Sequence, residues 1–199
     1  MSNKKYSMSF TAGGLLHSES VIVAHLYTRL NDWDAVKAKV IAENSLQSRA
    51  VSTLKRLSSE VISRLQKLTA EEVEQLLTSS YDEQAYILWV ASCRRYQFIA
   101  DFAVEVLRER FITFKTDLHY ADFDIFFNRK CDWHDELENL TATTKQKVRQ
   151  VLFKMLREAK LLDDKNIIQA TIMSPELLAM LKRQNGSELM YFTVFEDAL

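Results

Sequence analysis

Glycine and proline are almost absent from this chain, which has three glycines and one proline in 199 residues. Tight β-hairpin turns need positive φ angles, which favour glycine, so a fold rich in hairpins is not expected. Apolar residues make up 47% of the chain and charged residues 27%, as in ordinary globular proteins. We therefore expect a mainly helical fold with a sizeable core.

Other features of the sequence indicate the cellular compartment in which the protein is expected to work. Cys93 and Cys131 have no paired spacing, which indicates a reducing cytoplasm without disulfides. The first ten residues, MSNKKYSMSF, contain no apolar run and no cleavage site, so no signal peptide is expected. The longest apolar run, Ala85–Ala91, is too short to span a bilayer. A soluble, cytoplasmic protein without a membrane partner is the expectation.

The net charge of −1 hides a strong segregation along the chain. Residues 1–68 carry a net +5, residues 69–140 a net −8, residues 141–160 a net +5 and residues 161–199 a net −3. Two basic blocks in a nearly neutral protein indicate a surface oriented toward a polyanion. The alternative is that the basic blocks face the acidic block within the fold.

The most basic segment is Thr141–Leu162, and its pattern is that of an amphipathic helix. Its apolar residues recur at helical spacing and form one stripe: Val148, Val151, Leu152, Met155, Leu156 and Ala159. The opposite face is predicted to carry Gln146, Gln150, Phe153, Lys154 and Arg157, flanked by Lys147 and Arg149. Cations neutralise phosphates, and Gln or Arg can reach base edges in a major groove. Many basic helices are nevertheless only a solvated face over a core.

The flanking segments favour a DNA-binding unit. Asp122–Lys130 and Trp133–Leu140 read as two short helices, and Thr143 or Thr144 can cap the basic helix that follows. Asn166–Met173 is β-branched and strand-like. Three helices followed by a strand is the order of a winged helix-turn-helix, although many three-helix units bind proteins instead.

We therefore predict a mainly α fold in which an N-terminal helical bundle is followed by a winged helix-turn-helix-like unit with a small C-terminal β-sheet. The predicted parts are an N-terminal arm at 1–17, the bundle at 18–115 and the DNA-binding unit at 116–199. The tail LMYFTVF is expected to pair with Asn166–Met173. Within the bundle, Thr69 and Glu72 have capping-box spacing, and a helix break is expected near Arg94–Tyr96.

Catalytic signatures are not evident. Gly13-Gly14 lacks the spacing and the Lys-Ser/Thr pair of a phosphate-binding loop, and there is no Gly-x-Ser-x-Gly elbow. Cys131 and His134, with His119 nearby, lack a fourth metal ligand. We expect a protein that is not an enzyme and has no cofactor, metal or small-molecule substrate.

Five blocks of the sequence resemble the BrxA family, which is encoded in bacterial BREX phage-exclusion systems. The blocks are SFTAGGLLHSES, LNDWDAVKAKVIAENSL, RAVSTLKRLSSEVISRLQKLT, ILWVASCRRYQFIADFAVEVLRERF and LTATTKQKVRQVLFKMLREAKLL. The resemblance implies a cytoplasmic, non-enzymatic component of a multi-protein defence system that binds double-stranded DNA. It also implies a likeness to NusB, a small helical RNA-binding bundle.

Charge and helical geometry, rather than the family, supply the expected contacts with duplex DNA. On the basic helix they are Thr143, Thr144, Lys145, Gln146, Lys147, Arg149, Gln150, Lys154 and Arg157. A second group, Arg49, Lys55, Arg56 and Arg64, is expected to extend the footprint. The alternatives are an adaptor that joins other BREX proteins and a NusB-like RNA binder.

Overall fold

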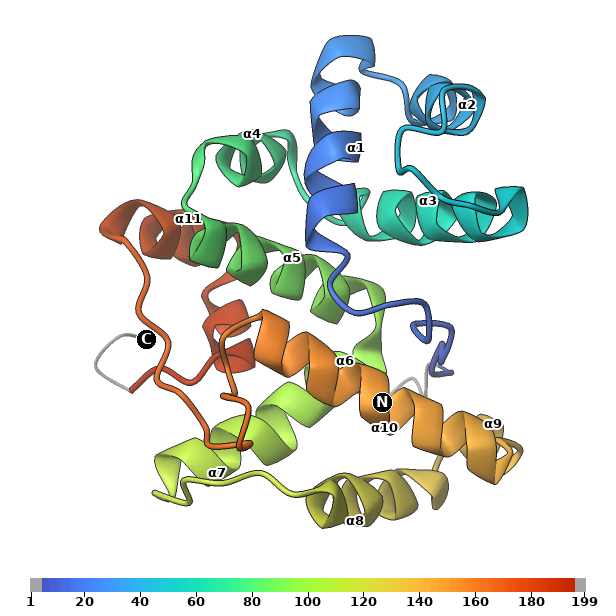
Figure 1. Ribbon diagram of the computed structural model, residues 1–199. Coiled ribbons are helices and arrows are strands. Elements are labelled where there is room, and N and C mark those ends of the chain that lie inside the picture. The colour runs from blue at the N-terminus through green and yellow to red at the C-terminus, as the bar shows by residue number, and fades with distance from the viewer. Residues whose placement is uncertain (1–4, 196–199) are drawn as a thin grey trace. The chain divides into compact units, whose positions relative to one another are not determined.

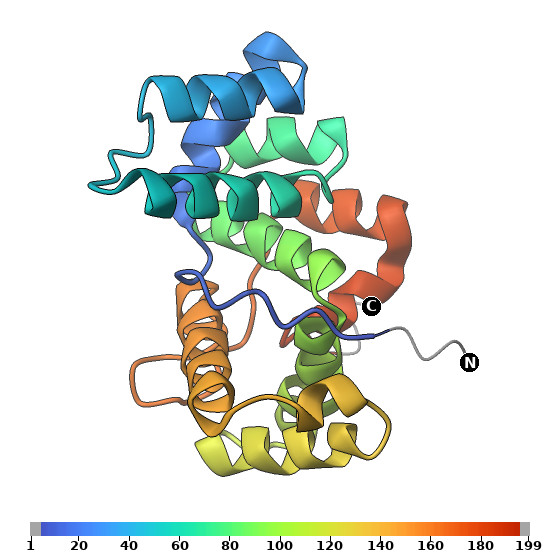
Figure 2. The ribbon, with the colours of Figure 1, turned by 90° about the vertical axis from the view of Figure 1, so that its right-hand side faces the viewer.

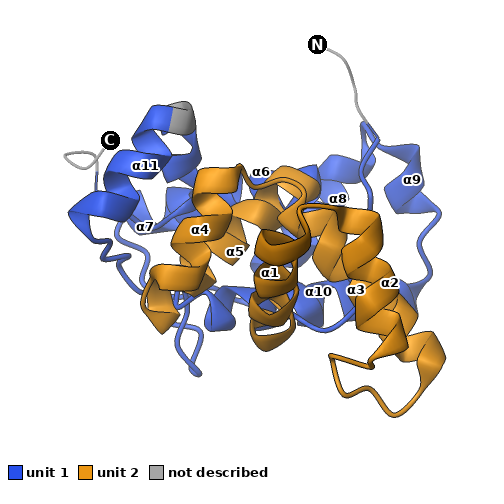
Figure 3. Cartoon of the chain, turned by 90° about the horizontal axis from the view of Figure 1, so that it is seen from above, with its two compact units in different colours: residues 1–14, 96–199 blue, residues 15–95 orange. Residues whose placement is uncertain are grey.

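The computed structural model describes residues 5–195, and its regular structure is helical (Figure 1). The chain divides into two compact units (Figure 3). One unit is residues 15–95, and the other joins residues 1–14 to residues 96–199. The division expected from the sequence, into residues 1–17, 18–115 and 116–199, stays a prediction. Residues 1–4 of the expected arm lie outside the described residues.

The unit of residues 15–95 consists of five helices: α1 (His17–Leu30), α2 (Trp33–Ala42), α3 (Val51–Leu65), α4 (Ala70–Thr78) and α5 (Tyr81–Arg95). Every residue of α5 from Ala85 to Cys93 is buried. A helix that is apolar on nearly all sides needs neighbours all round it. Within this unit α5 packs against α1, α3 and α4.

Local signals explain where several of these helices begin. The predicted capping box is confirmed: Thr69 Oγ1 accepts from the backbone N–H of Glu72 at 3.3 Å, and Glu72 Oε2 accepts from that of Thr69 at 2.8 Å. The break between α5 and the next helix falls at Tyr96, as expected. The second helix is capped by Asp32.

The other unit contains α6 (Gln97–Phe102), the π-helical turn η1 (Ala103–Arg108) and α7 (Glu109–Ile112) in one continuous rod. It continues with α8 (Tyr120–Cys131), α9 (Asp135–Glu138), α10 (Ala142–Glu158), α11 (Pro175–Asn185) and the 3₁₀ helix η2 (Gly186–Tyr191). Aromatic rings fill its core, with Phe98 and Phe102 packing edge-on against Phe126 at 5.2 and 5.3 Å. Figure 2 shows the chain turning back through α9 between α8 and α10.

The predicted C-terminal β-sheet is wrong. Within residues 5–195, isolated β-bridges join only Asp117 to Ile167 and Leu162 to Ile168. The tail does reach the expected neighbour, since the N–H of Thr171 donates to the carbonyl of Thr193 at 2.9 Å. A ladder does not form because residues 186–191 wind into η2, which leaves too few extended residues to pair.

Among the helices that the structure describes, none combines the length and apolar character that crossing a membrane would require.

Candidate nucleic-acid interface

The basic helix predicted from the sequence is α10, and it begins at a different cap. Thr141, rather than Thr143 or Thr144, accepts the capping hydrogen bond, from the N–H of Thr144 at 3.2 Å. Thr143 is exposed on the first turn, and Thr144 is half-buried. The hydroxyls of Thr141 and Thr144 also lie 2.9 Å apart. Both threonines expected to hold a phosphate therefore lie at the N-terminus of the helix, one of them already engaged.

The buried side of α10 is wider than predicted. Phe153, which was expected on the polar face, is fully buried and packs edge-on against the ring of Tyr120 at 4.6 Å. The prediction failed because Tyr120 begins α8, which is distant in sequence, and extends the apolar surface around the helix. The residues that stay exposed along α10 include Gln146, Lys147, Gln150 and Lys154.

Two of the predicted contact cations, Lys145 and Arg149, face an acidic residue on α8. Arg149 Nη1 donates to Asp124 Oδ2 at 2.7 Å, and Lys145 Nζ lies 3.5 Å from Asp124 Oδ1. Lys145 also donates to the side-chain carbonyl of Asn128 at 3.0 Å. The Lys145 and Arg149 side chains are 27% and 23% exposed, so both are reached by water yet held by α8.

Aromatic rings on α8 support the same two cations. The guanidinium carbon of Arg149 lies 4.7 Å from the centroid of the Tyr120 ring, and Lys145 Nζ lies 4.6 Å from that of Phe127. A cation over a ring face is attracted by the ring quadrupole. The two rings therefore help to hold both charged groups against α8.

The remaining cations of α10 differ in solvent exposure and in the contacts that they make. The Lys147 side chain is exposed on the polar face. Lys154 is 57% exposed and lies 3.5 Å from Glu158 one turn later, an arrangement that contributes little to stability. Arg157 is half-buried and donates to the side-chain oxygen of Asn166 at 2.7 Å. The strongest outward charges of α10 are thus Lys147 and Lys154.

The second predicted group belongs to the other compact unit. Arg49 precedes α3 and is exposed, as are Lys55 and Arg56 on the helix itself. Arg64 is 2% exposed, and its Nε donates to Glu60 at 2.7 Å within the helix. A buried guanidinium in an ion pair cannot reach a phosphate, so three residues of this group remain accessible.

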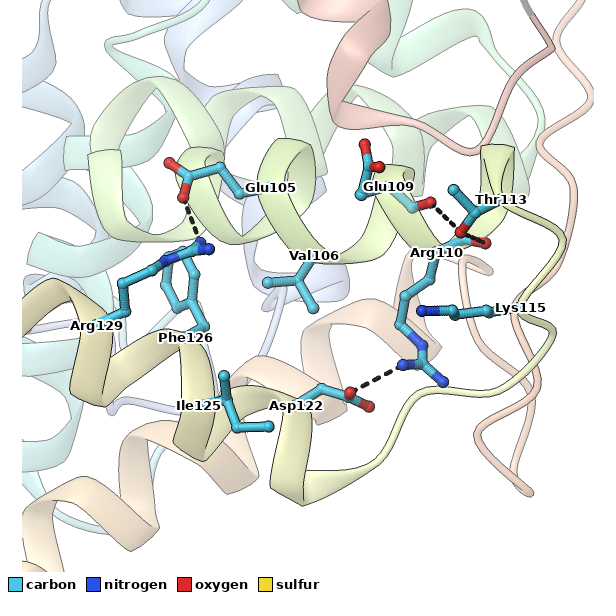
Figure 4. Close-up of a pocket in the computed structure, with 10 residues that line it drawn as sticks. All are labelled: Glu105, Val106, Glu109, Arg110, Thr113, Lys115, Asp122, Ile125, Phe126 and Arg129. Atoms are coloured by element: carbon cyan, nitrogen blue, oxygen red, sulfur yellow. Dashed lines mark hydrogen bonds and ion pairs between the residues drawn. The ribbon is translucent and has the colours of Figure 1, made fainter.

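A groove between the η1–α7 rod and α8 was not anticipated from the sequence. Its volume is about 210 Å³, and Val106, Ile125 and Phe126 supply apolar surface (Figure 4). Two ion pairs lie on its rim: Arg129 with Glu105 at 2.7 Å and Arg110 with Asp122 at 2.9 Å. The π-helical turn beside it is a feature that often accompanies functional sites, and periodicity of sequence alone does not reveal such a turn.

The residues considered for a metal site have other partners. His134 Nδ1 lies 3.0 Å from Glu136 Oε1, and His119 Nε2 lies 2.7 Å from Asp117 Oδ2. Burial, followed by the charge of Glu138, raises the pKa of the Cys131 thiol above its ordinary value. Over the described part of the chain, no three His, Cys, Asp or Glu residues cluster as metal ligands would.

Comparison with known proteins identifies the family. A sequence model of the BrxA family matches residues 4–185. The chain belongs to the BrxA family. It is 25% identical over 190 residues to BREX protein BrxA of Escherichia coli O9:H4 (strain HS), a match that covers 94% of this chain and 89% of that protein.

Two further similarities are more limited. The chain is 28% identical over 124 residues to BREX protein BrxA of Bacillus cereus (strain H3081.97), and this match covers 62% of each protein. A crystal structure of an uncharacterized protein from Magnetospirillum magneticum matches with a TM-score of 0.84 at 21% identity, over 96% of this chain and 98% of that one. At that identity the likeness shows that the two proteins share a fold.

Proposed function

We propose that this BrxA-family protein is a non-enzymatic, cytoplasmic component of a BREX system that binds duplex DNA through the exposed face of α10. Two relatives carry the name BREX protein BrxA, which supports the assignment to that system. The observation that carries DNA binding is the row of polar and basic side chains along α10 over a fully buried opposite side.

The dimensions of this row suit a major groove. Gln146, Gln150 and Lys154 follow at intervals of four residues, so they share one face of the helix, with Lys147 beside them. At about 1.5 Å of rise per residue the row extends over about 12 Å along the helix axis. A helix about 10–12 Å in diameter fits into a major groove about 12 Å wide. Two amides can reach base edges, and the lysines can neutralise phosphates.

The order of elements agrees with this docking mode. In a helix-turn-helix protein the recognition helix follows a shorter helix and a turn, and its N-terminal half contacts the bases. Here α8 and the short α9 precede α10. Phosphate contacts made by the two lysines carry no sequence information and only two amides can read bases, so binding with weak sequence preference follows.

The groove beside α8 favours a second candidate, an adaptor role in the defence complex. Ile125 on its rim is 68% exposed, and an apolar side chain in such a position is typical of a protein contact. An RNA ligand would use the same cations as duplex DNA, and it is therefore tested in the same experiment.

Fluorescence anisotropy of a labelled 20-base-pair duplex tests the proposal. The variant with Lys147→Glu and Lys154→Glu should bind at least about tenfold more weakly than the wild type, since two phosphate contacts are reversed. Lys182→Glu, a single charge reversal on an exposed position of α11 in the same unit, is the control and should change affinity little. Equal affinity of the double variant and the control would remove α10 as the interface.

Competition identifies the ligand class. Unlabelled duplex DNA should displace the probe, whereas duplex RNA and single strands should compete poorly. Displacement by RNA at lower concentration than DNA would instead favour the NusB-like alternative.

A further inference from the structure

One carboxylate, that of Asp124, occupies two cations of α10 at once. It accepts from Arg149 at 2.7 Å with one oxygen and faces Lys145 at 3.5 Å with the other. Lys145 and Arg149 stand one helical turn apart on α10, while Asp124 comes from α8. Two cations around one anionic group is also how a protein holds a DNA phosphate.

This pairing is open to exchange. Asp124 is 37% exposed, and exposed ion pairs are weak because water screens them. The guanidinium of Arg149 contacts the carboxylate through Nη1, and its buried Nε has no hydrogen-bond partner among the described residues. A bidentate Arg–carboxylate pair would be stronger, so the present contact leaves part of the capacity of Arg149 unused.

Lys145 and Arg149 would keep their positions if the Asp124 carboxylate moved away from them. Arg149 lies over the Tyr120 ring and Lys145 over the Phe127 ring, and neither contact depends on Asp124. Preorganised charges bind an incoming anion without a further ordering cost. The aromatic supports therefore leave a site ready for a phosphate in place of Asp124.

From these contacts we propose that Asp124 is an internal competitor for DNA phosphate, which withholds Lys145 and Arg149 from the duplex until a phosphate displaces its carboxylate. The inference rests on the proposed function, because it assumes that α10 faces DNA. Its consequence is that Asp124 lowers sequence-independent affinity, which grows with the number of phosphates neutralised. Base contacts made by Gln146 and Gln150 then contribute a larger share of the binding free energy relative to phosphate contacts.

Asp124→Asn tests the proposal because it removes the charge and keeps nearly the same shape. With the duplex used above, this variant should bind about tenfold more tightly at low salt, and its plot of log affinity against log salt should steepen by about 0.9, for one further phosphate. Asp132→Asn, at an exposed position directly after α8, makes the same charge change and should alter the slope little. Identical behaviour of the two variants would overturn the competitor role.

A double-mutant cycle separates local competition from a general rise in positive potential. Arg149→Gln should weaken binding only slightly in the wild type, where the arginine is engaged by Asp124, and much more in the Asp124→Asn background. Equal losses in both backgrounds contradict the proposal. Asp124→Ser must reproduce the Asn result, and thermal melting of each variant identifies a folding defect.

The two proposals fail in different ways. If the wild type binds DNA and reversal of Lys147 and Lys154 weakens it, but Asp124→Asn changes nothing, the competitor role alone is wrong. If no variant of α10 or Asp124 alters binding, the interface itself is wrong.

Discussion

The ring of Tyr6 stacks on the imidazole of His134 with centroids 3.9 Å apart. Glu136 completes the contact, since its Oε1 accepts from the backbone N–H of Tyr6 at 2.6 Å and lies 3.0 Å from His134 Nδ1. The Tyr6 hydroxyl donates to Asp101 on α6. The segment before α1 is thus fixed to α6 and to the start of α9 within one unit.

Replacing Tyr6 by Phe should lower the free energy of unfolding by about 1.5–3 kcal/mol, the usual value of a hydrogen bond to a charged group. Burial, and then the bond to Asp101, raise the pKa of Tyr6 well above its ordinary value. This contribution is complete below about pH 10, where an unfolded tyrosine stays protonated, and it declines as the pH rises further. Urea unfolding of both proteins at pH 8 and pH 11 should therefore show the difference shrinking at pH 11. A difference independent of pH would contradict the assigned contact.

Glu136 gives the opposite pH dependence. Burial raises its pKa, but the backbone N–H of Tyr6 and its other hydrogen bonds outweigh burial and hold the pKa below the ordinary value. A lowered carboxyl pKa stabilises the fold above the unfolded value, about 4.5, and this stabilisation is lost as the pH falls below it. Glu136→Gln should consequently be less stable than the wild type at pH 7 and closer to it at pH 3. Unfolding curves that keep the same separation at both pH values would exclude this role.

Because Phe153 is fully buried, its side chain should contribute strongly to the free energy of unfolding. Phe153→Ala should cost about 3–5 kcal/mol, since it empties a fully buried site against Tyr120. Lys154→Ala at the neighbouring exposed position should change stability by less than about 0.5 kcal/mol. Chemical denaturation of the two variants measures both values, and a Phe153 variant as stable as the Lys154 variant would mean that the aromatic side chain faces solvent.

In the unit of residues 15–95, Arg94 neutralises a carboxylate that is 1% exposed. Its two terminal nitrogens each lie 2.6 Å from an oxygen of Glu72. Arg94→Met leaves that buried charge without its cation and should destabilise the protein by about 3–5 kcal/mol. The control Arg56→Met, at an exposed position of α3, should be nearly neutral in the same denaturation assay. Equal losses of unfolding free energy for the two substitutions would contradict a stabilising role for the Arg94–Glu72 ion pair.

Signals that lie close together in sequence predicted the fold well. The capping box at Thr69 and the break at Tyr96 depend on residues within one or two turns. Apolar periodicity likewise predicted the stripe of α10 that is buried. The β-branched composition of Asn166–Met173 led to the wrong prediction of a β-sheet. Strand pairing needs a second extended segment, and residues 186–191 form η2 instead.

The candidate site was predictable in its charge but not in its pairing. The exposed positions of Gln146, Lys147 and Gln150 follow from helical spacing alone. The contact of Arg149 with Asp124 could not follow from that spacing, because it joins residues 25 positions apart on different helices. The alternative that basic blocks face the acidic block is realised in part on α10, where Asp124 of the acidic block lies against both Lys145 and Arg149.

The salt dependence of duplex binding tests the central claim, which is that exposed cations of α10 meet DNA phosphates. The affinity of the wild type should fall steeply between about 50 and 200 mM salt, and reversing Lys147 and Lys154 should flatten the plot of log affinity against log salt by about 1.8. The Lys182→Glu control should retain the wild-type slope. A slope near zero for the wild type, or one unchanged by the double reversal, would contradict the claim.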